Sequence, residues 1–261
     1  RTLQMGNFQI HARNNIFVRR NTAQSDIALW CLPGFADTVA SFSTLFDTAL
    51  TEEATVIAPD LPGFGASPRM DHPSNIAAYV ETLAELIQLE TPNARVGFVG
   101  HSVGSVVATE AARLQGSQCL GVFSIEGNIT VEDAYFSGRA TEFDSAIEFK
   151  EFFTSHIWQR GAEDPIFRNY HAGLSQADPE AMWIFGRDVK NYSQDDQPGH
   201  ALLSLDCPTH YFWCADNTPE DTQVFIKKHN LPNTEVTGTS HWPMLDAADK
   251  VVESLQKFFK I

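Results

Sequence analysis

Residues 96–105 read VGFVGHSVGS and place Ser102 between two apolar segments. The first four residues have the continuous apolar character of a buried strand, and residues 103–114 have the pattern of a helix. Gly100 and Gly104 allow the strand and the helix to approach closely. The serine backbone between them takes a strained conformation that lifts the hydroxyl clear of the sheet. The stretch therefore predicts a sharp strand-to-helix turn that carries a nucleophilic serine.

The segments on either side of this turn alternate between strand-like and helix-like patterns. Short, continuous apolar runs predict strands covered on both faces, and apolar residues at intervals of three and four predict amphipathic helices. Such alternation is typical of parallel strands joined by right-handed crossovers. The predicted strands are 8–20 (two strands around a turn at Asn14 and Asn15), 27–32, 55–58, 96–99, 120–125, 211–215 and 235–237; the predicted helices are 74–89 (capped by Ser74), 103–114, 219–229 and 246–259.

The pattern changes after residue 125, because no strand-like run appears again until Tyr211. The residues between these points have helical character. At 261 residues the chain suits one α/β domain with an inserted subdomain better than two unrelated domains. We therefore expect an α/β core formed by residues 1–128 and 206–261, with residues 129–205 inserted as a helical cap.

Aromatic side chains are frequent in this insert, and small-molecule clefts are largely apolar and aromatic. The insert is therefore expected to cover a pocket. We expect Phe136 and Trp183 of the insert, together with Trp242 of the core, to line it. The alternative is that the rings only pack the insert onto the core.

The chain carries 33 acidic and 18 basic residues, a formal net charge of -15. This charge repels phosphate backbones and anionic lipid headgroups, so we expect a small-molecule substrate and neither nucleic acid nor a membrane as a partner. No segment approaches the ~20 apolar residues of a membrane span.

The chain has four cysteines, all in or beside apolar segments: Cys31, Cys119, Cys207 and Cys214. We expect free thiols in a reducing, cytoplasmic setting, with a Cys207–Cys214 bridge left open.

A serine hydroxyl needs a base to remove its proton, and histidine has a suitable pKa. His241 lies between the last predicted strand and the last predicted helix, in the segment GTSHWPML at 238–245. It is downstream of Ser102, as the chain order serine, acid, histidine requires. His101 adjoins the nucleophile on a strained turn and is expected to pack rather than to react.

Two carboxylates are candidates for the third member of the triad, the acid that accepts a hydrogen bond from the histidine. Glu126 and Asp216 each follow a predicted strand, so both lie at the carboxyl edge of the sheet, where open α/β folds carry their active sites. A charge at the end of a buried strand is costly without a partner, which favours Glu126. The turn residues around Asp216 explain that aspartate without catalysis. We favour Glu126 and keep Asp216 as the alternative acid.

The segment LPGFA at 32–36 follows an early strand and is suited to present backbone amides to an oxyanion. The predicted donors are the N–H groups of Phe35 and of Val103, the residue after the nucleophile. The sequence contains nothing that resembles a metal site, a phosphate loop or a dinucleotide fingerprint. No metal and no cofactor are therefore expected.

With these residues identified, the chain resembles the α/β-hydrolase superfamily over nearly its whole length. Pro33 departs from the family's pattern, because many members have histidine before the glycine. Four landmarks of the family occur in order: LPGF at 32–35, DLPGFGAS at 60–67, the turn at Ser102, and His241 followed by Trp-Pro-Met-Leu.

The resemblance implies an α/β-hydrolase fold, with a mostly parallel sheet of about eight strands, flanking helices and a helical cap inserted after the sixth strand. Most members place an aspartate after the seventh strand, where Asp216 lies. One subgroup of haloalkane dehalogenases and certain lactonases instead use a glutamate after the sixth strand, and Glu126 is similar in position. Dehalogenases and epoxide hydrolases of this fold need an aspartate where Ser102 stands, so those reactions are disfavoured.

These residues lead to the hypothesis of a serine hydrolase that cleaves a carboxylic ester or lactone through an acyl-enzyme. The aromatic insert favours a medium-sized, largely uncharged substrate. Two alternatives stay open, because the fold alone does not name a function. One is cleavage of a carbon–carbon bond in a diketone-like compound, and the other is a non-catalytic small-molecule receptor.

Overall fold

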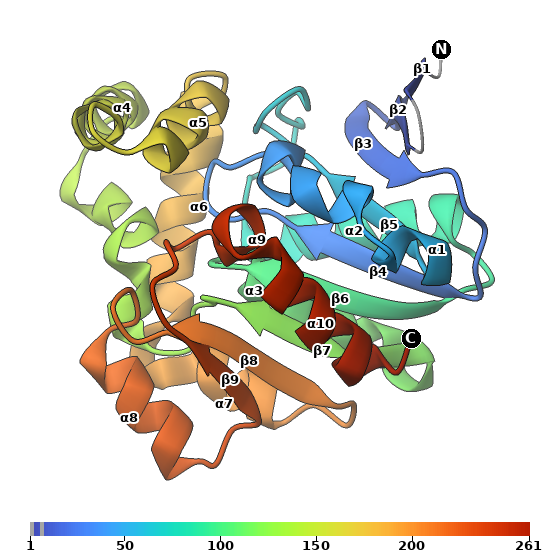
Figure 1. Cartoon of the computed structure of the whole chain (residues 1–261). Coiled ribbons are helices and arrows are strands. Elements are labelled where there is room, and N and C mark those ends of the chain that lie inside the picture. The colour runs from blue at the N-terminus through green and yellow to red at the C-terminus, as the bar shows by residue number, and fades with distance from the viewer. Residues whose placement is uncertain (1–2, 6–7) are drawn as a thin grey trace.

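The computed structural model describes residues 3–5 and 8–261. In this part of the chain, nine strands form one sheet in the order β1-β2-β3-β5-β4-β6-β7-β8-β9 (Figure 1). Neighbouring strands from β5 and β4 through to β9 run parallel, whereas β1, β2 and β3 pair antiparallel at one side. The strands are β1 Leu3–Met5, β2 Phe8–Arg13, β3 Ile16–Asn21, β4 Ile27–Leu32, β5 Thr55–Pro59, β6 Arg95–His101, β7 Cys119–Ile125, β8 Thr209–Cys214 and β9 Asn233–Val236.

The α/β-hydrolase fold predicted from the sequence is confirmed, with one strand added at the edge. Strands β2 to β9 correspond to the eight expected strands, and β1 pairs antiparallel with β2. The β2–β3 hairpin turns at Asn14 (φ 49°) and Asn15 (φ 64°), as predicted. Asparagine tolerates this left-handed conformation better than most residues, which explains the position of the turn.

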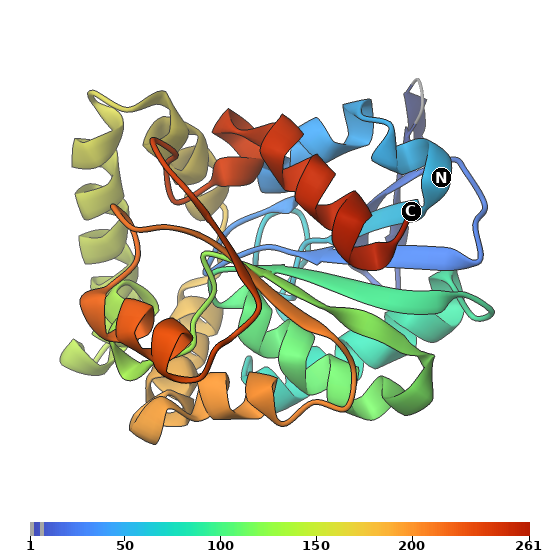
Figure 2. The same cartoon turned by 60° about the horizontal axis from the view of Figure 1, so that its bottom comes forward.

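Helices cover both faces of the sheet, because its central strands are apolar on both sides. Trp30, Phe98 and Phe123 on β4, β6 and β7 have no exposed surface. Figure 2 shows α10 and η1 on one face and α2 and α3 on the other. The helices of the core are η1 Val39–Asp47, α1 Leu50–Glu53, α2 Ile76–Glu90, α3 Gly104–Gln115, η2 Gly116–Gln118, α8 Glu220–Lys228, α9 Pro243–Asp246 and α10 Ala248–Phe259.

The start of α2 differs from the prediction by one residue. Asn75, not Ser74, is the N-cap, and its side chain accepts a hydrogen bond from the Ala78 N–H. Both residue types cap helices well, so the local sequence does not separate them. Asn75 has the extended backbone of a cap residue, whereas the Ser74 side chain is buried.

The segment between β7 and β8 contains only helices among its described elements. Figure 1 shows α4, α5 and α6 gathered at one end of the sheet. The rings of Phe149, Phe153 and Phe185 are buried and surround Phe35 of the core at centroid distances of 6.1, 5.6 and 6.1 Å. Part of the aromatic content therefore packs the insert onto the core. The helices are η3 Val131–Tyr135, η4 Ser137–Glu142, α4 Ala146–Gly161, α5 Pro165–Leu174, α6 Pro179–Tyr192, η5 Gln194–Asp196 and α7 Gln197–Leu203.

All four cysteines are free thiols. Cys207 lies beside Cys119, with 3.4 Å between the two sulfur atoms, and is not bridged to Cys214. Among the described helices, none is long and apolar enough to cross a membrane.

Two glycines bring β6 and α3 close together around Ser102. A Cβ atom on Gly100 would lie 2.4 Å from the Ser105 Cα, and one on Gly104 would lie 2.3 Å from the Leu32 carbonyl oxygen. Both distances are far below van der Waals contact, and both neighbouring atoms belong to the backbone. The glycines are therefore required by the approach of helix α3 to the sheet.

Gly104→Ala is expected to lower the free energy of unfolding by about 2 to 3 kcal/mol, because the added methyl group overpacks a rigid backbone contact. Gly138→Ala is the matched control, since its Cβ would meet the flexible Lys190 side chain at 2.8 Å. Urea denaturation at constant pH measures both changes. An equal, small loss in the two variants would contradict the close approach at Gly104.

Candidate active site

Ser102 occupies the turn between β6 and α3 in a left-handed conformation, with φ of 51°. Its N–H donates to the Ile125 carbonyl on β7 at 3.0 Å, and its own carbonyl accepts from the Ser105 N–H at 3.0 Å. These bonds hold a backbone conformation that costs a non-glycine residue roughly 1–2 kcal/mol. The half-buried serine is thereby fixed at the carboxyl end of β6.

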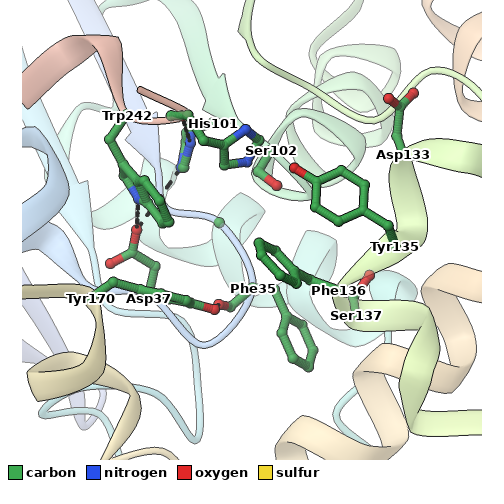
Figure 3. Close-up of a pocket in the computed structure, with 12 residues that line it drawn as sticks. Phe35, Asp37, His101, Ser102, Asp133, Tyr135, Phe136, Ser137, Tyr170 and Trp242 are labelled. Carbon is green, nitrogen blue, oxygen red and sulfur yellow. Dashed lines mark hydrogen bonds and ion pairs between the residues drawn. The ribbon is translucent and has the colours of Figure 1, made fainter. Parts of the chain in front are cut away.

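A small cavity of about 20 Å³ adjoins Ser102, and Figure 3 shows the side chains around it. The core contributes Phe35 and His241, and the insert contributes Tyr135 and Tyr170. This volume is about what one ordered water molecule needs.

His241 lies on the loop between β9 and α9, and hydrogen bonds on both sides fix this loop. The Ser240 N–H donates to the Asp246 carboxylate at 2.7 Å, and the Trp242 N–H donates to the Ser240 hydroxyl at 3.0 Å. His101 Nε2 donates to the His241 carbonyl at 2.8 Å. The imidazole of His241 is thus held at the cavity that Ser102 also lines.

Glu126 is the carboxylate next to His241, at 3.7 Å from its Oε2 atom to His241 Nδ1. It follows β7 directly, with φ of 46°, and its side chain is 2 % exposed. The Cys214 N–H donates to Oε1 at 2.7 Å, and the Thr218 hydroxyl donates to Oε2 at 3.2 Å. A buried carboxylate held in this way can orient a neighbouring imidazole and stabilise its protonated form.

Asp216 lies in the turn after β8, and its side chain is exposed. The N–H groups of Asn217 and Thr218 both donate to the Cys214 carbonyl and close this turn. Within the described chain, no ion pair joins Asp216 to His241, whereas one joins Glu126 to it. The geometry therefore favours Glu126, the acid preferred from the sequence.

The amides of Phe35 and Val103 lie on the two loops that flank the serine. Val103 precedes α3, and its N–H makes no hydrogen bond to the described backbone; the same holds for the N–H of Phe35. The Tyr170 hydroxyl of α5 donates to the Phe35 carbonyl at 2.6 Å, so the insert contacts this loop directly. Free amides at such a position can stabilise a developing oxyanion.

A second histidine and carboxylate pair lies beside the site and was not predicted from the sequence. Asp37 Oδ2 accepts from Trp242 Nε1 at 2.9 Å and lies 3.9 Å from His101 Nδ1 (Figure 3). Burial lowers the pKa of His101 well below its ordinary value, and His241 adds to this effect. His101 is therefore neutral, and its packing role extends to fixing the His241 backbone.

The three residues expected to line the pocket separate into two groups. Phe136 and Trp242 line the cavity beside Ser102. Trp183 does not line this cavity: its indole N–H donates to the Phe143 carbonyl, and Arg187 stacks on its ring. The missed residues Tyr135 and Tyr170 line the cavity instead. Only their membership of the aromatic insert marked them in the sequence.

In the residues that the structure describes, no group of three or more His, Cys, Asp or Glu side chains could hold a metal ion. The chemistry available at the site is that of a serine, a histidine, a carboxylate and two backbone amides. This set of groups, on a mostly parallel sheet with its active-site turn after a central strand, defines a serine-hydrolase-like α/β protein.

Comparison with known proteins agrees with this class. A model of the alpha/beta hydrolase family matches residues 31–254, so the chain belongs to that family. No curated protein matches the chain.

Solved structures with the same fold include a thermophilic esterase from Thermogutta terrifontis (TM-score 0.74, 17% identity, 94% of this chain and 93% of that chain). They also include the N-acyl homoserine lactonase AidH (TM-score 0.74, 17% identity, 100% of this chain and 95% of that chain). A third is an esterase from Exiguobacterium antarcticum (TM-score 0.71, 16% identity, 98% of this chain and 100% of that chain). At these identities the likeness establishes the fold.

Asp37→Asn is expected to change how stability depends on pH. Burial raises the pKa of Asp37 to about 6, above its ordinary value of 3.8, so the folded state holds this proton more tightly than the unfolded state. The contribution of Asp37 to the free energy of unfolding therefore falls as pH rises from about 4 to 6. Asparagine does not titrate, so this loss is absent in the variant. The free energy of unfolding of the variant, relative to that of the parent, should therefore rise by about 2 to 3 kcal/mol between pH 4 and pH 6.

Urea denaturation of both proteins at several pH values between 4 and 7 measures this change. Asp249→Asn, at an exposed carboxylate on α10, is the matched control and should leave the profile parallel to that of the parent. A profile of Asp37→Asn that is also parallel would contradict the raised pKa.

Proposed function

We propose that this protein is a serine hydrolase that cleaves a carboxylic ester or lactone, with Ser102, His241 and Glu126 as its triad. The observation that carries the proposal is the arrangement of these groups. Ser102 projects from a strained turn into a cavity shared with His241, and the imidazole of His241 lies 3.7 Å from the buried Glu126 carboxylate. Esterases and a lactonase among the proteins of the same fold agree with it.

In the proposed mechanism, His241 removes the Ser102 proton while the hydroxyl oxygen attacks the carbonyl carbon. The N–H groups of Phe35 and Val103 stabilise the oxyanion of the tetrahedral intermediate. The protonated His241 then donates its proton to the leaving oxygen, and the acyl-enzyme forms. Water activated by His241 hydrolyses this acyl-enzyme, and Glu126 stabilises the imidazolium in both steps.

We propose residues 129–205 as the cap of this site. Tyr135, Phe136, Ser137 and Tyr170 come from that segment and line the cavity beside Ser102. The cap therefore excludes water from the reacting groups, which strengthens their electrostatic interactions. The aromatic lining suits an apolar acyl group.

Ser102→Ala is expected to reduce hydrolysis of p-nitrophenyl acetate and of γ-butyrolactone by about a thousandfold or more, because the nucleophile is lost. Ester hydrolysis is followed by absorbance and lactone hydrolysis by acid release. Ser175→Ala, on the exposed surface of the cap, is the matched control and should keep full activity. Undiminished turnover of both compounds by Ser102→Ala would overturn the proposed function.

Glu126→Gln and Asp216→Asn distinguish the two candidate acids. Loss of the Glu126 charge should lower kcat by about a hundredfold or more, because the imidazolium loses its buried counter-charge. Asp216→Asn should change kcat by less than about threefold, since this side chain is exposed and makes no ion pair with His241 in the described structure. The opposite ranking would assign the acid to Asp216.

A further inference from the structure

A second cavity adjoins His241 and is not lined by Ser102. It has a volume of about 310 Å³ and is lined by His241, Ser240 and side chains of the cap. Tyr135 and Phe136 line both this cavity and the one beside Ser102, whereas Ser102 and Phe35 line only the latter. His241, Tyr135 and Phe136 are therefore shared by two cavities of different size.

The chemistry of acyl transfer assigns a role to each space. The imidazole nitrogen that takes the Ser102 proton returns it to the leaving oxygen, so this oxygen lies beside both Ser102 and His241, and the rest of the leaving group extends past His241. The acyl carbon must lie against the serine and the oxyanion donors. The reacting atoms therefore lie at the cavity beside Ser102, and the second cavity, which shares Tyr135 and Phe136 with it, is the space for the rest of the leaving group.

Among the described residues that line the second cavity, Arg160 is the only lysine or arginine. This residue lies near the end of α4, next to the start of α5 (Figure 1). Its guanidinium carbon is 3.9 Å from the centre of the Phe167 ring and 5.6 Å from that of Phe136. Stacking of this kind orients the guanidinium but leaves its in-plane N–H groups free to donate.

Two carboxylates, those of Asp164 and Asp216, also line this cavity, and neither forms a salt bridge with the Arg160 guanidinium in the described structure. The Asp164 carboxylate accepts from the Ile166 N–H at 2.8 Å and caps α5. In the described structure, no salt bridge within 4.0 Å joins Arg160 to Asp164 or to Asp216, which also lines the cavity. Two carboxylates nearby disfavour a free carboxylate ligand, because like charges repel. The lining suits an uncharged group that offers an oxygen acceptor.

We infer that the second cavity binds the leaving group and that Arg160 determines specificity there. The preferred substrates are esters or lactones whose leaving alcohol carries an uncharged acceptor, such as an amide carbonyl, within reach of the guanidinium. This inference rests on the proposed function and adds the class of leaving group to it.

Two nearly isosteric acetate esters test the inference, one of γ-hydroxybutyramide and one of isohexyl alcohol. The parent protein should have the higher kcat/KM for the amide ester. Arg160→Met should lower kcat/KM for the amide ester by about tenfold, as expected for loss of a hydrogen bond to a charged donor, and change the isohexyl ester by less than twofold. The carboxylate analogue, the acetate of γ-hydroxybutyrate, should fall below the amide ester in the parent.

Arg187→Met is the matched control, because Arg187 also stacks on a cap aromatic ring, Trp183 at 4.8 Å, but does not line this cavity. It should leave the ratio of the two esters unchanged. Thermal denaturation checks folding, and Arg160→Gln replaces Arg160→Met if the latter does not fold.

An unchanged ester ratio in a folded Arg160 variant would overturn the inference while the proposed function stands. The same holds for an equal change in Arg187→Met, or for preference for the carboxylate analogue. No Ser102-dependent hydrolysis of either ester would overturn the proposed function and this inference together.

Discussion

Two neighbouring residues in left-handed conformations, Ser102 (φ 51°) and Glu126 (φ 46°), set the geometry of the whole site. They directly follow β6 and β7, whose last residues are paired in register. The Ser102 N–H donates to the carbonyl of Ile125, and the Glu126 N–H donates to that of Phe212 on β8. Each strained residue is therefore held by the next strand of the sheet. A strained backbone persists only where its surroundings over-determine it, and here the parallel sheet does so.

The loops that follow the strands are likewise held in place by hydrogen bonds from residues far away in the chain. Asp37 from the loop after β4 accepts a hydrogen bond from the Trp242 indole, and His101 at the end of β6 donates to the His241 carbonyl, so both hold the loop that carries His241. The Asp60 carboxylate accepts from the N–H groups of Val39 and Ala66. The DLPGFGAS segment thus holds the start of η1, which follows the Phe35 loop, and does not line the cavity beside Ser102. Its role is structural, although it is a landmark of the family.

The sequence was enough to predict the strands and turns that are determined by neighbouring residues in the chain. Each central strand was an apolar run, and the asparagine pair at the β2–β3 turn matches its backbone there. The role of Asp37 could not be predicted, because its partner Trp242 lies 205 positions away. Trp183 does not line the cavity beside Ser102, and the aromatic content of the insert could not show this, because composition does not tell which face of a helix a ring occupies. The roles of Ser102, His241 and Glu126 stay predictions, which the geometry favours and activity measurements decide.

The insert and the loop that carries Phe35 are in direct contact, which links two parts of the proposed site. Tyr170 of the cap donates to the Phe35 carbonyl at 2.6 Å, and three cap phenylalanines surround the Phe35 ring. Phe35 and Tyr170 also line the cavity beside Ser102 together. A displacement of α5 must break the Tyr170 bond or carry the Phe35 loop with it. Under the proposed function, such a displacement would therefore also disturb the proposed oxyanion donor at Phe35, so the insert and this donor are not independent of each other.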